Sequence, residues 1–271
     1  MEINVLCVGD VVGNPGRQIL RRGLDYLRSQ HKIDCVVVNA ENTAGGSGLT
    51  SQLNDKLKRY GVDLITLGDH IYRRRDIIPV LEKSKHIVKP ANFLDGAPGK
   101  DVAICDTASG PRVAAISVMG RMFMKPPVNC PFAAVDRVLG SLPQDVKIII
   151  VDMHAEATSE KVAMGWHLDG RVSAVVGTHT HIPTSDETIL PNGTAYITDM
   201  GMTGPYESVL GRDRHRVLSA LRTGVPTTFD VAEKDLRLCG ILVTVDASTG
   251  KATRLQRIRV NEADAPAPVE G

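Results

Sequence analysis

The sequence predicts an α/β fold in which a largely parallel sheet is covered by helices on both faces. Short, uninterrupted apolar runs such as Cys35–Asn39 (CVVVN) and Lys147–Val151 (KIIIV) are typical of strands that are buried on both faces. These runs alternate with segments of helical periodicity, which is typical of chains built from strand–helix–strand units. With 271 residues, of which 42% are hydrophobic and 23% charged, the chain is long enough to bury a substantial core.

The first third of the chain is expected to alternate regularly between strands and helices. In the first helix the apolar residues at positions 19, 20, 24 and 27 share one face, and Asn14-Pro15 is expected to supply its N-cap and first position. The expected strands are Ile3–Val8, Cys35–Asn39 and Asp63–Leu67, with Ile87–Lys89 extended, and the expected helices are Pro15–Ser29, Thr50–Tyr60 and Asp76–Lys83.

In the rest of the chain, a second stretch of alternating strands and helices is expected between two stretches of antiparallel strands. Turn residues at 109–111, 191–193 and 248–250 each separate two strand-like runs. From Thr188 onward the pattern predicts antiparallel strands. The expected strands are Val102–Cys105, Arg112–Val118, Lys147–Val151, Val172–Val176, Glu187–Leu190, Thr194–Thr198, Leu238–Asp246 and Ala252–Val260, and the expected helices are Phe132–Leu139 and Ser159–His167.

The chain is predicted to form one domain over residues 1–261, because neither an internal repeat nor a linker divides it. Residues 262–271 are rich in proline, alanine and acidic side chains, and they are expected to form a flexible C-terminal tail. Two basic runs, Arg73–Arg75 and Arg212–Arg216, are expected to be solvated, since a run of like charges usually faces water. The alternatives are that Arg73–Arg75, which follows His70 closely, meets a nucleotide phosphate, and that Arg212–Arg216 forms a mobile loop near the site.

Composition and charge exclude several classes of protein. A formal net charge of +1 provides no strong field for non-specific binding of nucleic acid or of a membrane surface. The five cysteines are scattered singly, which favours buried thiols in a reducing compartment over a disulfide framework. The N-terminus lacks the pattern of a secretory signal, and no apolar run is as long as a membrane span. We therefore expect a cytoplasmic protein.

Acidic and imidazole side chains follow five of the predicted parallel strands, at the point where each strand ends. Because the carboxyl ends of parallel strands meet at one edge of a sheet, where open α/β folds bind ligands, these side chains are expected to lie together. They are Asp10 after the first strand, Glu41 and Asn42 after the second, Asp69 and His70 after the third, His154 after Lys147–Val151, and His179 and His181 after Val172–Val176.

This set of side chains predicts a metal centre. Burying several acids and imidazoles side by side is costly unless cations pair with them. Asp10, Glu41 and Asp69 contribute three negative charges, so two divalent ions and one bridging hydroxide would bring the sum to zero. Mixed carboxylate, amide and imidazole ligands suit Fe, Mn, Zn or Co rather than a thiolate-bound metal. Two such ions about 3.5–4 Å apart can clamp a phosphate ester and supply the attacking hydroxide.

The spacing of His179 and His181 allows two interpretations. Alternate residues of an extended segment point to opposite sides, so both imidazoles contact one centre only if the chain turns there. Gly177 makes such a turn plausible, and the other polar strand ends favour this interpretation. The alternative places one histidine inward and the other on the surface.

The order of these residues resembles the calcineurin-like metallophosphoesterases, and within them the YmdB-like branch, described as 2′,3′-cyclic-nucleotide phosphodiesterases. The resemblance spans the chain from about residue 3 to residue 260, and it depends on the combination of four motifs. It implies a four-layer α/β/β/α sandwich in which helices flank two mixed sheets. The motifs are Gly9–Gly13 (GDVVG), Asn39–Asn42 (NAEN), Gly177–Thr184 (GTHTHIPT) and Asp199–Tyr206 (DMGMTGPY).

Matched residue by residue, the family pattern implies a centre of two transition-metal ions and one proton donor. The pair would be divalent or of mixed valence, with iron as the first expectation and manganese or zinc as alternatives. The implied roles are Asp10, Glu41, Asn42 and His181 for one ion, Glu41 as a bridge to the second, Asp69, His154 and His179 for that second ion, and His70 as the proton donor.

Two positions depart from the wider superfamily that the chain resembles. Its pattern opens with Asp-x-His, whereas the third position here is Val12, so one imidazole ligand is missing and Asn42 is expected to fill the vacancy. The usual Gly-Asn-His becomes Gly68–His70 (GDH) in this chain. The added negative charge of Asp69 should favour a more tightly held or higher-valence ion.

The expected activity is hydrolysis of a small nucleotide phosphodiester, with 2′,3′-cyclic nucleotides opened to 3′-nucleotides and His70 as the proton donor. Two alternatives use the same residues: a phosphomonoesterase or nucleotidase, and a regulatory protein that binds metal and nucleotide with little turnover. A dinucleotide-binding oxidoreductase fails on pattern, because the glycines at 9, 13 and 16 lack GxGxxG spacing. Whether RNA or a second copy of the chain also binds is left open.

Overall fold

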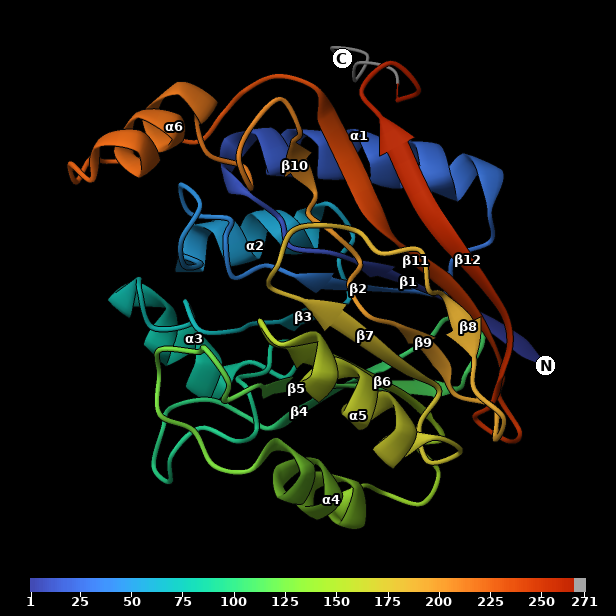
Figure 1. The fold of residues 1–271 in the computed structure, drawn as a ribbon. Helices are drawn as coiled ribbons and strands as arrows, with labels where there is room; N and C mark the ends of the chain where they lie inside the picture. The colour runs from blue at the N-terminus through green and yellow to red at the C-terminus, as the bar shows by residue number, and fades with distance from the viewer. Residues whose placement is uncertain (266–271) are drawn as a thin grey trace.

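The computed structural model describes residues 1–265 of the chain. These residues form two mixed sheets that pack face to face, with helices on the two outer faces (Figure 1). The fold is therefore the four-layer α/β/β/α sandwich that the sequence resemblance implied, and this prediction is confirmed. Within residues 1–265, no helix is long and apolar enough to cross a membrane.

The first sheet contains β1 (Glu2–Val8), β2 (Cys35–Asn39), β3 (Leu64–Thr66), β10 (Gly204–Pro205), β11 (Leu236–Asp246) and β12 (Ala252–Asn261). Its order is β10-β11-β1-β2-β3, with β12 paired to β11. The strands β1, β2 and β3 run parallel, whereas β11 runs antiparallel to β1 and β12 antiparallel to β11. The carboxyl ends of three neighbouring parallel strands therefore lie at one edge of this sheet.

The second sheet contains β4 (Val102–Asp106), β5 (Arg112–Met119), β6 (Ile148–His154), β7 (Ala174–Thr178), β8 (Thr188–Ile189) and β9 (Ala195–Ile197), in the order β4-β5-β6-β7-β9-β8. Its middle strands are parallel, and β4 and β8 are antiparallel edge strands. The prediction of antiparallel strands from Thr188 onward is confirmed for the β8–β9 and β11–β12 pairs, but it missed that β9 also pairs with β7 in parallel.

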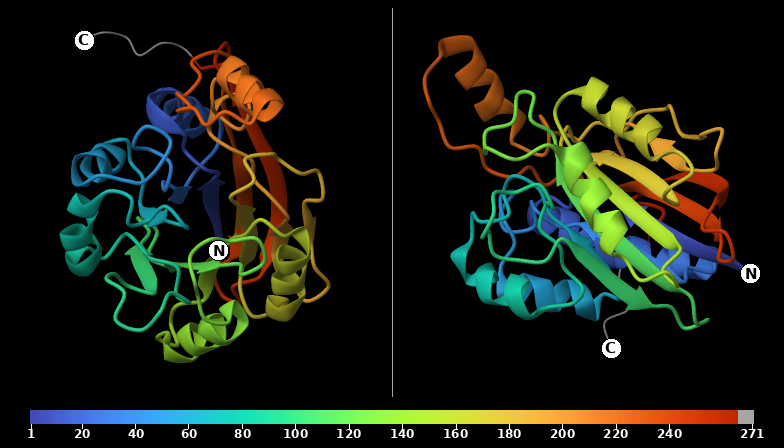
Figure 2. Two further views of the ribbon diagram at one scale, coloured as in Figure 1. Left: turned by 60° about the vertical axis from the view of Figure 1, so that its left-hand side comes forward. Right: turned by 90° about the horizontal axis from the view of Figure 1, so that it is seen from below.

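Helices cover both outer faces of the sandwich (Figures 1 and 2). On the first sheet lie α1 (Gly13–Gln30), α2 (Ser51–Arg59) and α3 (Ile78–Lys83), the last preceded by a 3₁₀ turn (Arg75–Ile77), and on the second lie α4 (Pro131–Ser141) and α5 (Thr158–Leu168). In β1, Leu6 and Val8 pack beneath the helices, while Val5 and Cys7 pack between the sheets. This alternation buries both faces of the strand.

The start of α1 differs from the sequence prediction. The helix begins at Gly13, whose φ of 62° allows the sharp turn out of β1, and Asn14 lies inside the first helical turn. The N-cap is Val12, which offers no side-chain cap, and the Asn14 side chain accepts a hydrogen bond from Arg17 (3.1 Å). The prediction that Asn14 caps the helix is therefore wrong, because the glycine makes the turn.

The second basic run leads into a helix that the sequence analysis did not predict. The helix α6 (Arg214–Thr223) begins after Asp213, whose carboxylate accepts a hydrogen bond from the Arg216 amide (2.9 Å). It stands away from the sandwich in Figures 1 and 2. Arg212 donates a hydrogen bond to the Gly45 carbonyl (3.1 Å), which ties the base of this helix to the loop after β2.

Four residues of the expected flexible tail lie within the described part of the chain. Glu262 forms an ion pair with Arg22 of α1 (3.2 Å), and Ala265 is 3% exposed in the apolar core between the first sheet and its helices. Ala265 is thus buried against the sandwich, whereas residues 262–264 are exposed. Residues 266–271 of the expected tail lie outside the described residues.

Candidate metal centre

Carboxyl ends of strands from both sheets meet at one edge of the sandwich, and four predicted ligands lie there. The donor atoms of Glu41, Asp69, His154 and His179 all lie within 4.8 Å of one another. Glu41 follows β2 and Asp69 follows β3 in the first sheet, while His154 ends β6 and His179 follows β7 in the second. The cluster therefore spans the two sheets.

The three remaining predicted ligands join this cluster near the end of β1. Asp10 Oδ2 accepts a hydrogen bond from the His179 backbone amide (3.1 Å), and Asp10 Oδ1 lies 3.9 Å from His181 Nε2. Asn42 Nδ2 lies 3.2 Å from the same His181 nitrogen and donates to Glu41 Oε1 (3.1 Å). All seven predicted ligands thus lie in one cluster, with Glu41 between its two halves.

The hydrogen bonds around His154 determine which ring nitrogen carries its proton. The buried Asp152 carboxylate accepts a hydrogen bond from the Thr178 hydroxyl (2.6 Å). Because Thr178 gives its one hydrogen to Asp152, its oxygen accepts the hydrogen of His154 Nδ1 (2.8 Å). When the imidazole is neutral, as a metal ligand must be, the lone pair of His154 is therefore on Nε2, the nitrogen that faces the centre of the cluster.

The outer nitrogens of the other two imidazoles are held in the same way. His179 Nε2 lies 3.3 Å from the Glu156 carboxylate, and His181 Nδ1 lies 3.0 Å from the Leu210 carbonyl oxygen. Both partners only accept hydrogen bonds, so these two nitrogens carry the hydrogens. The lone pairs of His179 Nδ1 and His181 Nε2 consequently point inward.

This donor set fits transition-metal ions. Three imidazole lone pairs face three carboxylates, and Asp10 Oδ1 is buried without a hydrogen-bond partner. Such an arrangement repels itself unless cations lie among the donors. Imidazole ligands whose outer N–H is held by an acceptor are typical of metal sites in proteins, and the mixture of nitrogen and oxygen donors suits Fe, Mn or Zn.

The turn that brings both imidazoles inward lies at the histidines themselves. His179 has a φ of 94° and His181 a φ of 67°. Gly177 does not make the turn, because it lies within β7, where a Cβ would come 1.6 Å from the Thr198 carbonyl oxygen. Both imidazoles therefore point inward, as the first of the two interpretations predicted. The turn, however, is made by the positive φ values of the two histidines and not by Gly177.

The charges of the cluster shift the pKa values of its acids in opposite directions. Burial raises the pKa of Asp10 to about 7, with His154 opposing this shift and Glu41 adding to it. Burial also acts to raise the pKa of Asp69, but without an ion His154 Nε2 and His179 Nδ1 can carry protons that are donated to this carboxylate, and these hydrogen bonds lower that pKa. A cation beside Asp10 would lower its pKa, because it would pair with the charged form.

His70 lies beside the cluster with 26% of its side chain exposed. Its Nδ1 lies 2.8 Å from Asn42 Oδ1, its Nε2 lies 3.6 Å from Asp69 Oδ2, and its backbone amide donates to Glu41 Oε2 (3.2 Å). As a metal ligand, Asn42 would present Oδ1 to the centre in place of Nδ2. A half-turn of the Asn42 amide would then donate a hydrogen to His70 Nδ1 and leave the imidazole proton on Nε2.

Comparison with known proteins assigns the chain to a family. The model of the family described as YmdB-like protein matches residues 6–258. This chain belongs to the YmdB-like family. A 2′,3′-cyclic-nucleotide 2′-phosphodiesterase of Bacillus subtilis is 42% identical over 260 residues, which cover 96% of this chain and 98% of the relative. A putative phosphatase/phosphodiesterase of Mycoplasma pneumoniae is 35% identical over 97% of this chain and 95% of its own length.

Two solved structures share the YmdB-like fold of this chain. A hypothetical protein from Thermus thermophilus superposes with a TM-score of 0.87 at 38% identity, covering 96% of this chain and 100% of its own. A novel phosphatase from Mycoplasma pneumoniae gives a TM-score of 0.89 at 33% identity, covering 96% of this chain and 94% of its own. These likenesses extend over both sheets and their helices.

Four residues that support this YmdB-like site were not identified from the sequence: Asp152, Glu156, Lys161 and Asp199. Asp199 opens one of the four motifs of the sequence analysis, and Asp152 lies two residues before His154, but their contacts with Thr180 and Thr178 are made between chain segments. Lys161 lies on α5 and is 1% exposed, although a lone lysine in a helix usually faces water. Nothing in the linear sequence distinguishes it from a surface lysine.

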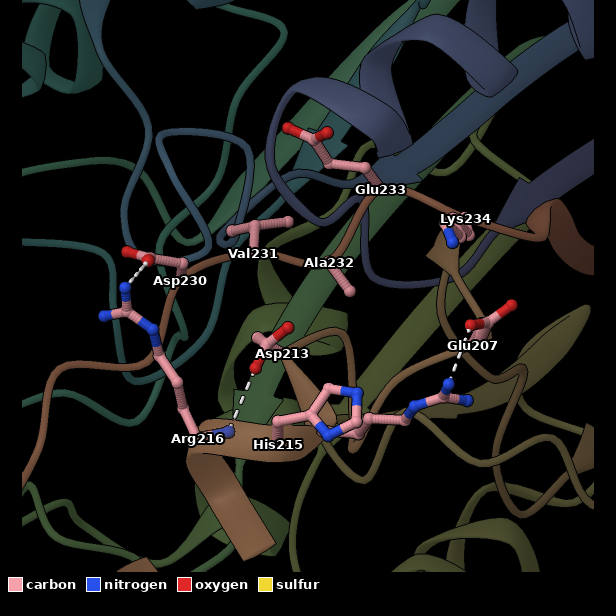
Figure 3. Close-up of a pocket in the computed structure, with 10 residues that line it drawn as sticks. Glu207, Asp213, His215, Arg216, Asp230, Val231, Ala232, Glu233 and Lys234 are labelled. Carbon is pink, nitrogen blue, oxygen red and sulfur yellow. Dashed lines mark hydrogen bonds and ion pairs between the residues drawn. The ribbon is translucent and has the colours of Figure 1, made fainter. Parts of the chain in front are cut away.

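A cavity of about 400 Å³ lies at the start of α6 (Figure 3). Its two arginines are paired with acidic side chains, Arg214 with Glu207 (3.1 Å) and Arg216 with Asp230 (2.9 Å). None of the seven predicted metal ligands lines it. The cavity is therefore not part of the cluster at the strand ends.

Replacing Thr178 by valine should weaken metal binding by about tenfold at the site to which His154 is predicted to belong. Valine keeps the shape of the side chain but leaves His154 Nδ1 without its acceptor, so the ring is free to rotate. The control is Thr66→Val, which removes another hydroxyl bonded to Asp152 (2.5 Å) without touching His154. Isothermal titration of the metal-free variants with Mn²⁺ measures the effect, and equal affinities for the two variants would contradict it.

Proposed function

We propose that this chain is a metal-dependent phosphodiesterase that opens 2′,3′-cyclic nucleotides to 3′-nucleotides. The observation that carries the proposal is the buried cluster in which imidazole lone pairs and carboxylates face one another within 4.8 Å. The proposal is supported by the printed activity of the Bacillus subtilis relative, which is 42% identical over nearly the whole chain. A phosphate ester is the class of substrate that such a dinuclear centre can clamp.

The seven residues divide between two ions in this proposal. Asp10, Asn42 and His181 would hold one ion and Asp69, His154 and His179 the other, with Glu41 shared. When bound, two such ions lower the pKa of water and neutralise charge on the phosphate. We propose iron first, with manganese or zinc as alternatives, because mixed oxygen and imidazole donors suit these metals.

The contribution of the chain to the chemical step is the proton donor His70. The Asn42 amide holds the ring at Nδ1, with 2.8 Å between Nδ1 and Asn42 Oδ1 in this structure, and this leaves Nε2 free to protonate the departing ribose oxygen. His70 is partly exposed, whereas Glu41 and His154 are buried, so a substrate reaches this imidazole from the solvent side. Donation on the 2′ side of the ring yields a 3′-nucleotide.

We also propose that the enzyme works in the cytoplasm. All five cysteines are free thiols, and this cysteine usage is typical of proteins in a reducing compartment. Cys35 and Cys105 lie with their sulfur atoms 3.5 Å apart across the two sheets, at hydrogen-bond distance and without a disulfide between them.

Removing the metal should abolish hydrolysis of 2′,3′-cyclic nucleotides and lower the unfolding temperature. A ligand present at 100 times its dissociation constant stabilises the folded state by about 2.7 kcal/mol, and chelation removes this contribution. The measurements are metal content after purification without chelator, the melting temperature before and after chelation, and rates on 2′,3′-cyclic nucleotides, 3′,5′-cyclic nucleotides and monoesters. Full activity in chelated protein would contradict the proposal, and a preference for monoesters would favour a nucleotidase.

A further inference from the structure

A buried ion pair lies behind the two histidines that follow β7. Lys161 Nζ lies 2.6 Å from Asp199 Oδ2, and the side chains of both residues are 1% exposed. Lys161 comes from α5, and Asp199 comes two residues after the end of β9. Neither belongs to the seven residues of the metal cluster, so the catalytic proposal leaves this pair without a role.

The Asp199 carboxylate holds the residue between the two histidines. Its Oδ2 accepts hydrogen bonds from the Thr180 hydroxyl (2.7 Å) and the Thr180 backbone amide (3.3 Å), in addition to the contact with Lys161. Its Oδ1 accepts a hydrogen bond from the Gly201 amide (2.8 Å). With four donors, the carboxylate is fully engaged, and Thr180 is fixed at both its backbone and its side chain.

Thr180 needs such an anchor because of the backbone on either side of it. His179 (φ 94°) and His181 (φ 67°) both occupy the left-handed region, which residues other than glycine adopt only when their surroundings impose it. An extended backbone at these positions would direct the two imidazoles to opposite sides. The inward orientation of both rings therefore depends on what holds the turn.

The pair is better explained by positioning than by stability. A buried ion pair is seldom more stable than apolar side chains of the same volume, since desolvation offsets the attraction between the charges. What this pair provides, and apolar groups cannot, is a carboxylate oxygen at a fixed place beneath Thr180. We propose that Asp199, held by Lys161, is a positioning residue that locks the His179-Thr180-His181 turn so that one imidazole faces each metal ion. This inference rests on the proposed metal centre.

The proposal is tested by titrating metal-free protein with Mn²⁺ in a calorimeter. Thr180→Val removes the hydroxyl that Asp199 holds, and we expect binding to weaken by about 10- to 100-fold at both sites, because the turn carries a ligand of each. Thr180→Ser keeps the hydroxyl and should restore both affinities. The matched control is Thr198→Val, at the residue just before Asp199. It removes a hydroxyl that donates a hydrogen bond to the Asp186 carboxylate, and it should leave the Mn²⁺ affinities of both sites unchanged.

A second variant removes the anchor itself. Lys161→Met combined with Asp199→Leu replaces both charges by apolar groups of similar size, which keeps the core filled while Thr180 loses its partner. We expect this double variant to melt near the wild-type temperature without metal and to show the same two-site weakening. Wild-type affinities in both the Thr180→Val protein and the double variant would overturn the proposal, as would weakening at one site alone.

The outcomes separate this proposal from the proposed activity. A wild-type protein that binds two Mn²⁺ ions but hydrolyses no phosphodiester would overturn the activity and leave the positioning role to be decided by the variants. A wild-type enzyme that is active while Thr180→Val binds Mn²⁺ normally would overturn only the positioning role. A wild-type protein that binds no Mn²⁺ would overturn both.

Discussion

Replacing His70 by alanine is expected to lower kcat for a 2′,3′-cyclic nucleotide by about 10²–10⁴-fold, the range that a positioned general acid contributes. A ribose hydroxyl is a poor leaving group, so its oxygen needs a proton as the bond to phosphorus breaks. His70 is partly exposed beside the cluster, with Nε2 3.6 Å from Asp69 Oδ2. Metal content should be unchanged, because the seven predicted ligands do not include His70.

The leaving group separates the proton donor from other roles of His70. An aryl phosphodiester releases a phenolate that needs no proton, so His70→Ala should lose far less activity on bis(4-nitrophenyl) phosphate than on the cyclic nucleotide. The control is His167→Ala, which removes a histidine that pairs with Asp136 (2.9 Å) far along α5 from the cluster. Equal losses on both substrates, or loss of metal from His70→Ala, would contradict the assignment.

Residues that end strands could be predicted because their position in the fold is encoded locally. Asp10 and Asp69 each follow a run of apolar residues, and the carboxyl ends of parallel strands meet without further information about packing. By the same argument, His154 and His179 were placed at the carboxyl ends of their strands, which the structure has in the second sheet. The positions of the strand ends did not predict that two sheets pack face to face. That arrangement was implied by the resemblance to a known family.

Contacts between distant segments could not be predicted in this way. Lys161 and Asp199 are 38 positions apart, and the lysine looks like any other charged residue of a helix until the sheet beside it is known. The hydrogen bond between Thr178 and His154 depends on the register of β6 and β7. Such contacts orient the ligands, so the sequence predicts which residues gather but not how their rings are held.

Local rules failed where the backbone conformation was set by packing. Asn14 has the chemistry of an N-cap, yet the glycine before it makes the turn and the helix starts earlier. The histidines at 179 and 181 adopt positive φ, which a sequence pattern does not favour for these residues. Both departures lie beside the cluster, where close approach of the chain to the site outweighs intrinsic preference.

Replacing Gly68 by alanine should reduce metal binding and activity by about 100-fold or more, since it disturbs ligands directly and not through a neighbour. A Cβ at this position would lie 2.3 Å from His154 Nε2 and 2.4 Å from Glu41 Oε2, so both donors must move away. Crowding of this kind should also cost the metal-free protein about 1–3 kcal/mol of unfolding free energy. Mn²⁺ titration and thermal melting measure the two effects separately.

A glycine-to-alanine substitution far from the metal centre is the control. It separates the effect of a methyl group among the predicted ligands from the effect that alanine has on any helix or loop. Gly140 lies in α4, and a Cβ there meets no other atom within 4 Å, so Gly140→Ala should raise the unfolding free energy by about 0.5–1 kcal/mol and leave metal binding unchanged. Gly68→Ala that kept wild-type Mn²⁺ affinity would mean that Glu41 and His154 do not act as ligands in the positions seen here. We expect Mn²⁺ binding to be lost in Gly68→Ala and kept in Gly140→Ala, because only the methyl group at position 68 enters the space between Glu41 and His154.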